Sequence, residues 1–396
     1  MSRRKFIKTA SAAGVSASSL YWGSQSGLAA AAEEDEVPYV KFLHGTPEPA
    51  GDGREPIYDS IPRKEWERRW TTVDLRDKIG RQLNKRYNTD LIAPEFTLMN
   101  SNHTGFGVKV VYTKMVQNGE VVRSPDVPFS DVKEEFEGNG KGEAAKGKYH
   151  AVREDIPIVV TRRAEENVGC SEEDLMDQIT IDGIPAGVDM TAVNEASGSL
   201  CAPFHRNDYG EGWIVSGHVV GGEFGGASGT VVKQGEAGSE EKIGEVRDSQ
   251  VNADIDWAYV EDSVAGKYTV EKVVQENDMA STDYEIGGIV NDDTLINKAD
   301  TDETFYTQGE ATSRLNNTLI NVGGIGSSYV TSEHDTTNGD SGGILFGVGD
   351  NDYYAYVAGV MKSAVNEDND GDSCNDDTKS TTAETVENKA NGCFLT

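Results

Sequence analysis

The chain has 396 residues, which is long enough for two domains that each bury a core of their own. It carries 68 acidic against 36 basic side chains, a formal net charge of −32 at pH 7. A field of this sign repels nucleic acid and anionic membrane surfaces, so we expect neither as a partner.

The first 32 residues have the features of an export signal. Arg3 and Arg4 are followed by Phe6 and Lys8, then by a weakly apolar stretch rich in Ala and Ser. This pattern predicts a twin-arginine signal peptide, which is excluded from the fold. We therefore expect a secreted, extracellular protein that is exported already folded. The alternative is an exposed basic tail on a cytosolic protein.

Residues 33–190 are predicted to form a small α/β module. Apolar residues recur every fourth position in its longest helix, with acidic residues early and basic residues late, as the helix dipole favours. A charged, glycine-rich stretch at 134–148 predicts a mobile loop. The expected elements are helices 62–70, 72–87 and 171–178 and strands 105–113, 155–161 and 179–185.

The charge differs between the two halves of the chain. Residues 33–165 hold 21 basic and 24 acidic side chains, whereas residues 166–396 hold 11 and 44. One interpretation is that the near-neutral half docks on the acidic half as an intramolecular prosegment. The other is that it only has a less acidic surface. We predict maturation by cleavage at an exposed site such as Arg162-Arg163 or near 191–198.

Residues 191–396 are predicted to form one all-β domain with an acidic C-terminal tail. Short apolar runs alternate with Gly, Asp and Asn clusters about every ten residues, a spacing typical of an antiparallel sandwich or barrel. No segment with helical periodicity interrupts them.

The four cysteines, Cys170, Cys201, Cys374 and Cys393, all follow the signal, which suits an oxidising destination. Three pairings are possible, and proximity favours Cys170 with Cys201 and Cys374 with Cys393. No two of them have the spacing of zinc ligands, so no metal site is expected there.

The acidic tail contains one pattern that imitates a calcium loop. Asn366, Asp368, Asp370 and Gly371 are followed by Asp377 at the twelfth position. The flanks do not predict two helices, so solvated surface aspartates are the alternative to a structural calcium. No cofactor is otherwise expected.

The stretch TTNGDSGGILF, residues 336–346, places glycines around Ser341. A serine hydroxyl is a poor nucleophile unless a base lies beside it and donors face the oxyanion that it creates. Glycines allow the tight backbone turn that directs such donors. The stretch therefore predicts a nucleophile whose base and acid lie elsewhere in the chain.

His218 and Asp256 are the favoured partners of Ser341. His218 follows the apolar strand 213–215 and two small residues, which would place it at a strand end facing a cleft; a buried structural histidine is the alternative. Asp256 opens the apolar segment DWAYV, where a carboxylate would be partly buried and would need a partner. Asp254, two residues earlier on the same strand face, is the rival acid.

The order His218, Asp256, Ser341 and the motifs IVSGH, DIDWAYV and NGDSGG resemble the trypsin/chymotrypsin-like serine peptidase family. The resemblance covers about residues 191–365 and is nearest to bacterial and archaeal members. The chain departs from the family pattern at Ser216 and Gly217, where Thr and Ala are more usual. The acidity of the whole chain is similar to that of proteins from salt-loving microbes, haloarchaea in particular, although an ordinary acidic secreted protein would also fit.

This resemblance implies an all-β, antiparallel double barrel preceded by the α/β module, and a serine endopeptidase that works on polypeptide substrates through an acyl-enzyme. It implies catalytic roles for His218, Asp256 and Ser341. The backbone N–H groups of Gly339 and Ser341 would hold the oxyanion, and Asp340 would brace their loop rather than act in catalysis. Asp335 and the strand around Gly359, residues 357–364, would contact the substrate. The alternative is a catalytically inactive binding or surface protein on the same scaffold.

Overall fold

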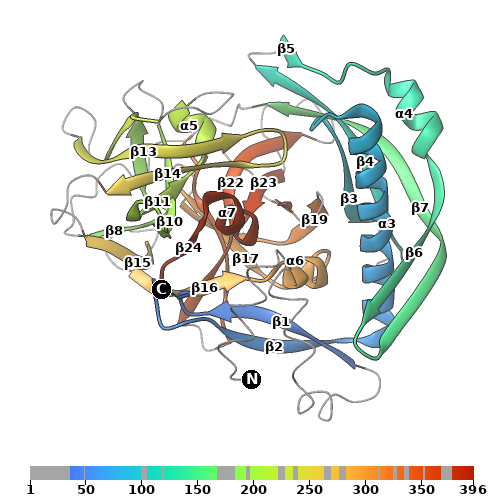
Figure 1. Ribbon diagram of the computed structural model, residues 1–396, viewed down its shortest axis with the longest axis horizontal. Coiled ribbons are helices and arrows are strands. Elements are labelled where there is room, and N and C mark those ends of the chain that lie inside the picture. Colours follow the sequence, from blue (N-terminus) through green and yellow to red (C-terminus); the bar gives the residue numbers. More distant parts are fainter. Residues whose placement is uncertain are drawn as a thin grey trace.

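The computed structural model describes most of the chain after the predicted signal (Figure 1). The described residues are 36–48, 50–99, 105–117, 120–166, 183–192, 197–221, 228–234, 240–262, 269–275, 282–310, 313–323, 328–333, 339–350, 353–366 and 377–396. The predicted signal, the predicted helix 171–178, Cys170 and Cys374 lie outside them. None of the helices in these ranges is long and apolar enough to cross a membrane.

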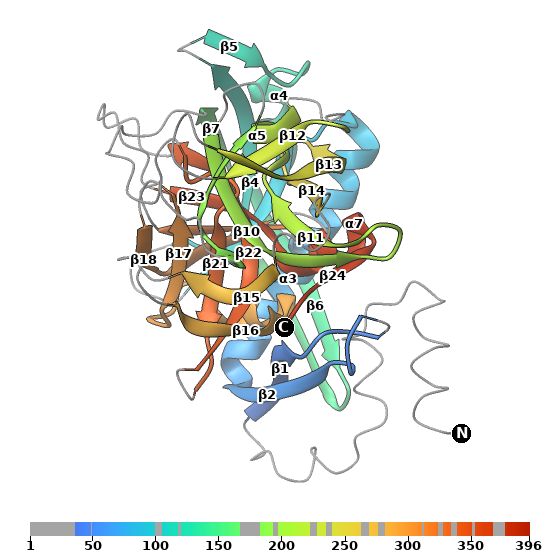
Figure 2. The ribbon, with the colours of Figure 1, turned by 90° about the vertical axis from the view of Figure 1, so that its left-hand side faces the viewer.

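Six antiparallel strands close into a first barrel, because β10 pairs with both β9 and β11 (Figure 2). Its apolar interior contains Trp213, Val215 and Val260, all fully buried. A seventh strand, β24 (Gly392–Phe394), pairs with β10 from outside the ring. The ring strands are β9 (Asp189–Ala192), β10 (Ser197–Arg206), β11 (Gly210–Val215), β12 (Val231–Gln234), β13 (Glu241–Val251) and β14 (Asp256–Asp262).

A second ring closes beside the first. Strand β17 pairs with β21, and the pairing continues through β22, β23, β20 and β19. Only Thr318 separates β19 from β18, which returns to β17 and completes the ring. Its strands are β17 (Phe305–Gly309), β18 (Ser313–Asn317), β19 (Leu319–Gly323), β20 (Tyr329–Glu333), β21 (Ile344–Val348), β22 (Tyr354–Asn366) and β23 (Asp377–Thr382). The predicted chymotrypsin-like double barrel is confirmed.

Three further strands and three helices complete the barrel region. Strand β16 (Thr282–Val290) runs parallel to β22 and pairs with β15 (Thr269–Gln275), which in turn pairs with β8 (Gly183–Ala186). The helices are α5 (Gly217–Gly221), α6 (Asp292–Lys298) and α7 (Ala383–Ala390). These helices have five, seven and eight residues, which is too short to show the periodicity by which a sequence predicts a helix.

The last part of the predicted acidic tail, residues 377–396, forms regular secondary structure. Residues 377–396 form β23, α7 and β24, and Ala383, Val386 and Phe394 belong to the apolar core between the barrels. Most of the predicted calcium loop, 367–376, lies outside the described residues.

The predicted disulfides are not formed by the two described cysteines. Cys201 and Cys393 are both free and buried. Cys201 lies within the core that the barrels share, where its thiol contacts the carbonyl of Gly359 at 3.7 Å. Burial raises the pKa of the Cys393 thiol to about 11, so this thiol is protonated and unreactive at neutral pH.

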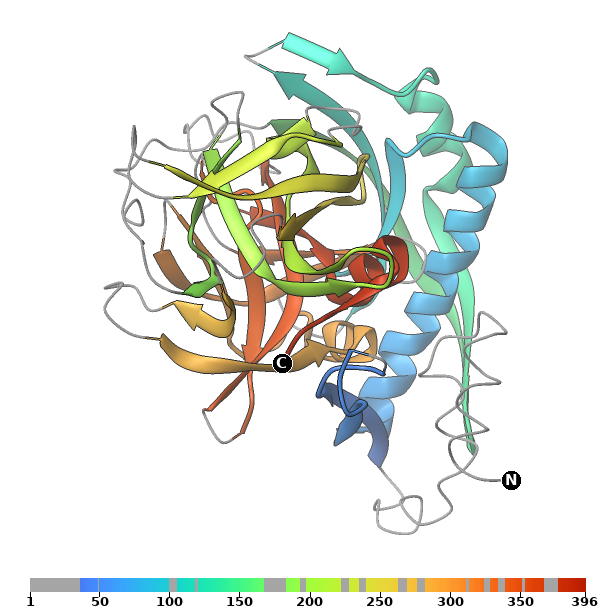
Figure 3. The ribbon, with the colours of Figure 1, turned by 60° about the vertical axis from the view of Figure 1, so that its left-hand side comes forward.

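The N-terminal module is a curved sheet that holds one long helix (Figure 3). The helix, α3, spans Arg63–Tyr87 without the break predicted at residue 71, and Leu75, Ile79 and Leu83 pack on the sheet. The remaining elements are β1 (Glu36–His44), β2 (Glu55–Pro62), β3 (Ile92–Leu98), β4 (Phe106–Gln117), β5 (Glu120–Arg123), α4 (Phe129–Phe136), β6 (Gly138–Lys146) and β7 (Tyr149–Glu166).

The prediction of a mobile loop at 134–148 is wrong, because this stretch forms the end of α4 and strand β6. Its glycines allow α3 to approach β6 closely. A Cβ atom at Gly142 would lie 1.7 Å from the carbonyl oxygen of Thr71. The glycines therefore serve helix packing rather than chain mobility.

Three strand pairings join the module to the barrel region. Strand β3 pairs with β19, β1 pairs with β16, and residues 164–166 at the end of β7 pair with residues 364–366 of β22. Phe42, Phe96 and Phe106 of the module share one apolar core with residues of the second barrel. The module is thus continuous with the second barrel.

Of the predicted cleavage pair, Arg162 is exposed but Arg163 is buried. Arg163 lies within β7, where its guanidinium binds the Glu95 carboxylate at 2.5 and 2.9 Å. This strand is paired with β4, so a protease would have to open the sheet to cut there.

Candidate active site

His218 and Asp256 are hydrogen-bonded at the rim of the first barrel. His218 follows β11 in the short helix α5, and Asp256 is the first residue of the neighbouring strand β14. His218 Nδ1 lies 2.5 Å from Asp256 Oδ2. Because Nδ1 faces an acid, it carries the proton and Nε2 keeps its lone pair. This is the tautomer that a general base requires.

The carboxylate of Asp256 is fully buried and surrounded by donors. Oδ1 accepts from the backbone N–H groups of Gly217 at 2.6 Å and His218 at 3.1 Å. Oδ2 also accepts from the Ser216 hydroxyl at 2.8 Å. Burial acts to raise the pKa of Asp256, but the charges of His218 and Lys362 and these hydrogen bonds outweigh it, so the pKa is lowered. Asp256 therefore remains ionised at neutral pH.

The rival acid, Asp254, is engaged elsewhere. Its carboxylate lies 3.8 Å from the ammonium of Lys379, and its backbone N–H donates to Asn252 Oδ1. Of the two candidate acids, the structure brings only Asp256 to His218.

A hydrogen bond across the two barrels anchors Asp256. Its backbone N–H donates to Thr381 Oγ1 at 2.9 Å, and Thr381 lies in β23 of the second barrel. The acid thus has a fixed position relative to the barrel that carries Ser341.

Ser341 lies in the turn before β21, pressed against the first barrel. Gly342 has a φ of 95°, and a Cβ atom there would lie 2.2 Å from Ser199 O and 3.0 Å from Ser216 N. The carbonyl of Ser341 accepts from the N–H of Ser199 at 2.8 Å. Only Gly fits at position 342, because any side chain would force the two barrels apart.

The Ser341 hydroxyl donates to the carbonyl of Lys362 at 3.2 Å rather than to His218. Ser216 connects the two halves, since its backbone touches the turn of Ser341 and its hydroxyl lies 2.8 Å from His218 Nδ1. Rotation about χ1 redirects a serine hydroxyl without moving the backbone, and such contacts often tighten only when substrate binds.

Two backbone donors beside Ser341 are available to a ligand. Within the described ranges, the N–H groups of Gly339 and Ser341 have no acceptor, whereas those of Gly342 and Gly343 donate within the fold. The carbonyl of Gly339 accepts from the Ser199 hydroxyl at 2.7 Å, which fixes the orientation of its peptide. The free donors are the two that the sequence predicted for an oxyanion.

The two predicted substrate contacts, Asp335 and Gly359, have different outcomes. Asp335 lies outside the described residues. Gly359 is buried inside β22, paired with Leu345 on one side and Thr382 on the other, so it has no open edge for a substrate. Its placement does not support the predicted role. Asp340 is buried, as expected of a residue that braces the turn.

Three residues of the site did not emerge from the sequence: Ser199, Thr381 and Lys362. Ser199 and Thr381 reach the site from distant strands, and nothing local marks them. Lys362 could have been found, because it is a single charged residue in the apolar run VAGVMKSA. A charge within such a run is buried only where a partner compensates it.

The chain matches no protein-family model, and no curated protein matches its sequence. Solved structures similar to it include Thermobifida fusca protease A, with 16% identity over 54% of this chain and 99% of that one and a TM-score of 0.39. Nocardiopsis protease has 16% identity over 54% and 100%, with a TM-score of 0.39. Cellulomonas bogoriensis chymotrypsin has 15% identity over 54% and 99%, with a TM-score of 0.38.

Proposed function

We propose that the chain is a serine endopeptidase that hydrolyses peptide bonds through Ser341, His218 and Asp256. One observation carries the proposal: Asp256 fixes the imidazole of His218 on the first barrel, and the turn of Ser341 packs on the same strand end from the second. Two free N–H groups flank the hydroxyl. This is the equipment that acyl transfer to a serine needs.

In the proposed reaction, Ser341 Oγ attacks the peptide carbonyl while His218 Nε2 takes its proton. The oxyanion accepts hydrogen bonds from Gly339 and Ser341, each worth about 3 kcal/mol in such sites. His218 then gives the proton to the leaving amine, and an acyl-enzyme remains on Ser341. Water, deprotonated by His218, releases the acid product, and Asp256 stabilises the imidazolium in both steps.

The test is labelling of the purified protein by a fluorophosphonate, with casein digestion measured in parallel. We expect label on Ser341, casein cleavage by the wild type, and the loss of both in Ser341→Ala. Ser332→Ala is the control, because this serine of β20 lies in the same barrel and its buried hydroxyl has no partner in the described structure. Absence of labelling in high salt, with or without the N-terminal module, would refute the proposal.

We also propose that the protein is secreted after removal of residues 1–32, that it works in concentrated salt and that the N-terminal module acts as a prosegment. The paired arginines, the net charge of −32 and the docking of the module on the second barrel support these points. Mass spectrometry of the culture supernatant tests both steps of processing. A product that begins near residue 33 shows export without maturation, and one that begins near 191 shows both.

A further inference from the structure

The turn that leads into Asp256 is held from several sides. The side chain of Asn252 accepts from the N–H groups of Asp254 and Ile255 at 2.9 and 2.8 Å, which shapes the turn. The N–H of Ala253 at its tip donates to Asp90 Oδ2 of the N-terminal module at 3.1 Å. Because this turn leads directly into Asp256, the contacts of its tip help to set the position of that residue.

Two buried lysines converge on the carbonyl of Ala253. Lys362 from β22 and Lys379 from β23 each place Nζ 2.6 Å from it, and they are only 4% and 2% exposed. Two ammonium groups this close repel each other, and each is costly to bury without a negative charge nearby. The two lysines act on different carboxylates.

Lys379 lies beside Asp254 and over the ring of Tyr329, 4.0 Å from its centroid. The positive charge of Lys362 instead acts on Asp256 and lowers the pKa of that carboxyl. Lys362 also contacts the nucleophile, because its carbonyl accepts from the Ser341 hydroxyl. The β22–β23 register shifts between Met361 and Ser363, so Lys362 sits at an irregularity that frees its backbone from the ladder.

We propose that Lys362 is a positioning residue of the active site, whose ammonium holds the turn of Ala253 and balances the buried charge of Asp256. This inference rests on the proposed function for its catalytic consequence. Titratable groups from several parts of the fold surround Asp256 and the turn that precedes it. They are His218 of α5, Lys362 and Lys379 of the second barrel, Asp254 of the turn and Asp90 of the module.

Removing this charge would act on the carboxyl of Asp256. The charge of Lys362 lowers the pKa of Asp256, so this pKa is expected to rise when the charge is lost. Asp256 would then take up a proton at a higher pH, and the neutral acid would no longer stabilise the imidazolium of His218. The acidic limb of the pH profile of kcat/KM would also move to higher pH, whereas KM at pH 9 would change little.

The experiment is an NMR titration of the full chain labelled with ¹³C-aspartate, with the Asp256 carboxyl signal assigned by its loss in Asp256→Asn. Lys362→Gln keeps a hydrogen-bonding group near Ala253 but removes the charge, and Lys362→Arg keeps the charge. Lys379→Gln is the matched control, because it donates to the same carbonyl at the same distance. We expect the upward shift in Lys362→Gln alone.

An unchanged midpoint in Lys362→Gln, or an equal shift in Lys379→Gln, would overturn the inference. The kcat/KM profile is measured on the same proteins. If Lys362→Gln shows the titration shift but the wild type shows no hydrolysis, the placement of Lys362 is supported and the proposed function is refuted, so the two failures are distinguishable. If Lys362→Gln does not fold, Lys362→Met serves, because its side chain has a similar volume.

Discussion

The two barrels contribute to the candidate site in different ways. The first carries His218 and Asp256 on a ring that closes on itself and buries its own core. The second carries Ser341, but its strands β19 and β22, and β16 beside them, also pair with the N-terminal module. The first barrel thus meets the module through side-chain contacts such as that of Asp90 with the Ala253 N–H, whereas the barrel that carries Ser341 shares strand ladders with the module.

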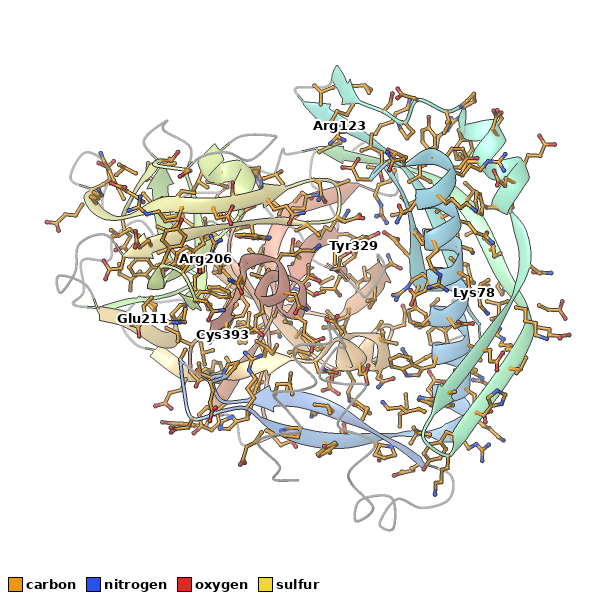
Figure 4. The ribbon with its side chains drawn as sticks, viewed as in Figure 1. Lys78, Arg123, Arg206, Glu211, Tyr329 and Cys393 are labelled. Atoms are coloured by element: carbon orange, nitrogen blue, oxygen red, sulfur yellow. The ribbon has the colours of Figure 1, made fainter. Side chains whose placement is uncertain are left out.

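The contact between the second barrel and the module involves buried charges as well as strands. The carboxylate of Glu95 is held by Arg163 and by the hydroxyl of Tyr329, which donates to it at 2.7 Å. Tyr329 belongs to the second barrel and lies where that barrel meets the module (Figure 4). Burial raises the pKa of Tyr329 well above its ordinary value, so the phenol stays protonated and keeps donating.

The largest expected effect comes from breaking this contact. Glu95→Ala leaves the guanidinium of Arg163 buried without its counter-charge, which typically costs about 3–5 kcal/mol. Urea denaturation measures the loss, and hydrogen exchange locates it. We expect faster exchange in β19 and β20 than in β11 and β14.

Glu154→Ala is the control, because it removes an ion pair with Lys141 that is exposed to solvent. Such pairs contribute little to stability, because water and salt screen them. If both barrels of Glu95→Ala lost protection from hydrogen exchange equally, this result would contradict the greater dependence of the second barrel on the module.

The stability of the barrel region is also expected to depend on pH. Glu384 at the start of α7 accepts from Asn291 Nδ2 at 2.9 Å and lies against Asp292 at the start of α6. Burial, with the nearby Asp293 and Glu387, raises the pKa of Glu384 to about 7. The folded chain therefore binds more protons than the unfolded chain above about pH 4.5, so this group lowers stability as pH rises, until it is fully ionised above about pH 7.

Glu384→Gln should lessen that decline while its amide oxygen still accepts from Asn291. The part that remains comes from Asp292, because burial also raises the pKa of that carboxyl. We expect a higher Tm than wild type at pH 8 and a similar Tm at pH 5, measured by calorimetry. Glu387→Gln should lower Tm at both values, because Glu387 pairs with Arg54. A wild-type Tm that is constant from pH 5 to 8 would count against the raised pKa.

The smallest effect concerns the link between the barrels. Thr381→Val removes the acceptor of the Asp256 N–H at nearly constant volume and should cost about 1–3 kcal/mol, since it leaves a buried donor unpaired. Thr331→Val is the matched control, because the buried Thr331 hydroxyl has no partner within the described ranges. It should be neutral or stabilising by chemical denaturation. An equal cost in both variants would show that the cross-barrel bond contributes nothing.

Strand spacing predicted an antiparallel sandwich or barrel, and the motifs around His218, Asp256 and Ser341, through the family that they resemble, implied the double barrel and the pairing of His218 with Asp256. The sequence patterns misled where packing between distant parts of the chain determines the role of a residue. The glycines at 140 and 142 suggest a loop, but they let α3 rest on β6. Cys201 suggests a disulfide, but it fills the core between the barrels. Lys362 and Thr381 reach the site through pairings between strands far apart in the chain, which no local pattern encodes.

The pairing of residues 164–166 with 364–366 bears on what a cut chain would look like. Scission anywhere from 167 to 182 would leave the two fragments joined by three strand ladders and a common apolar core. A nicked protein would therefore elute as one particle and separate only in denaturant. Separation of the N-terminal module from the barrels of such a nicked chain would be governed by dissociation rather than by proteolysis.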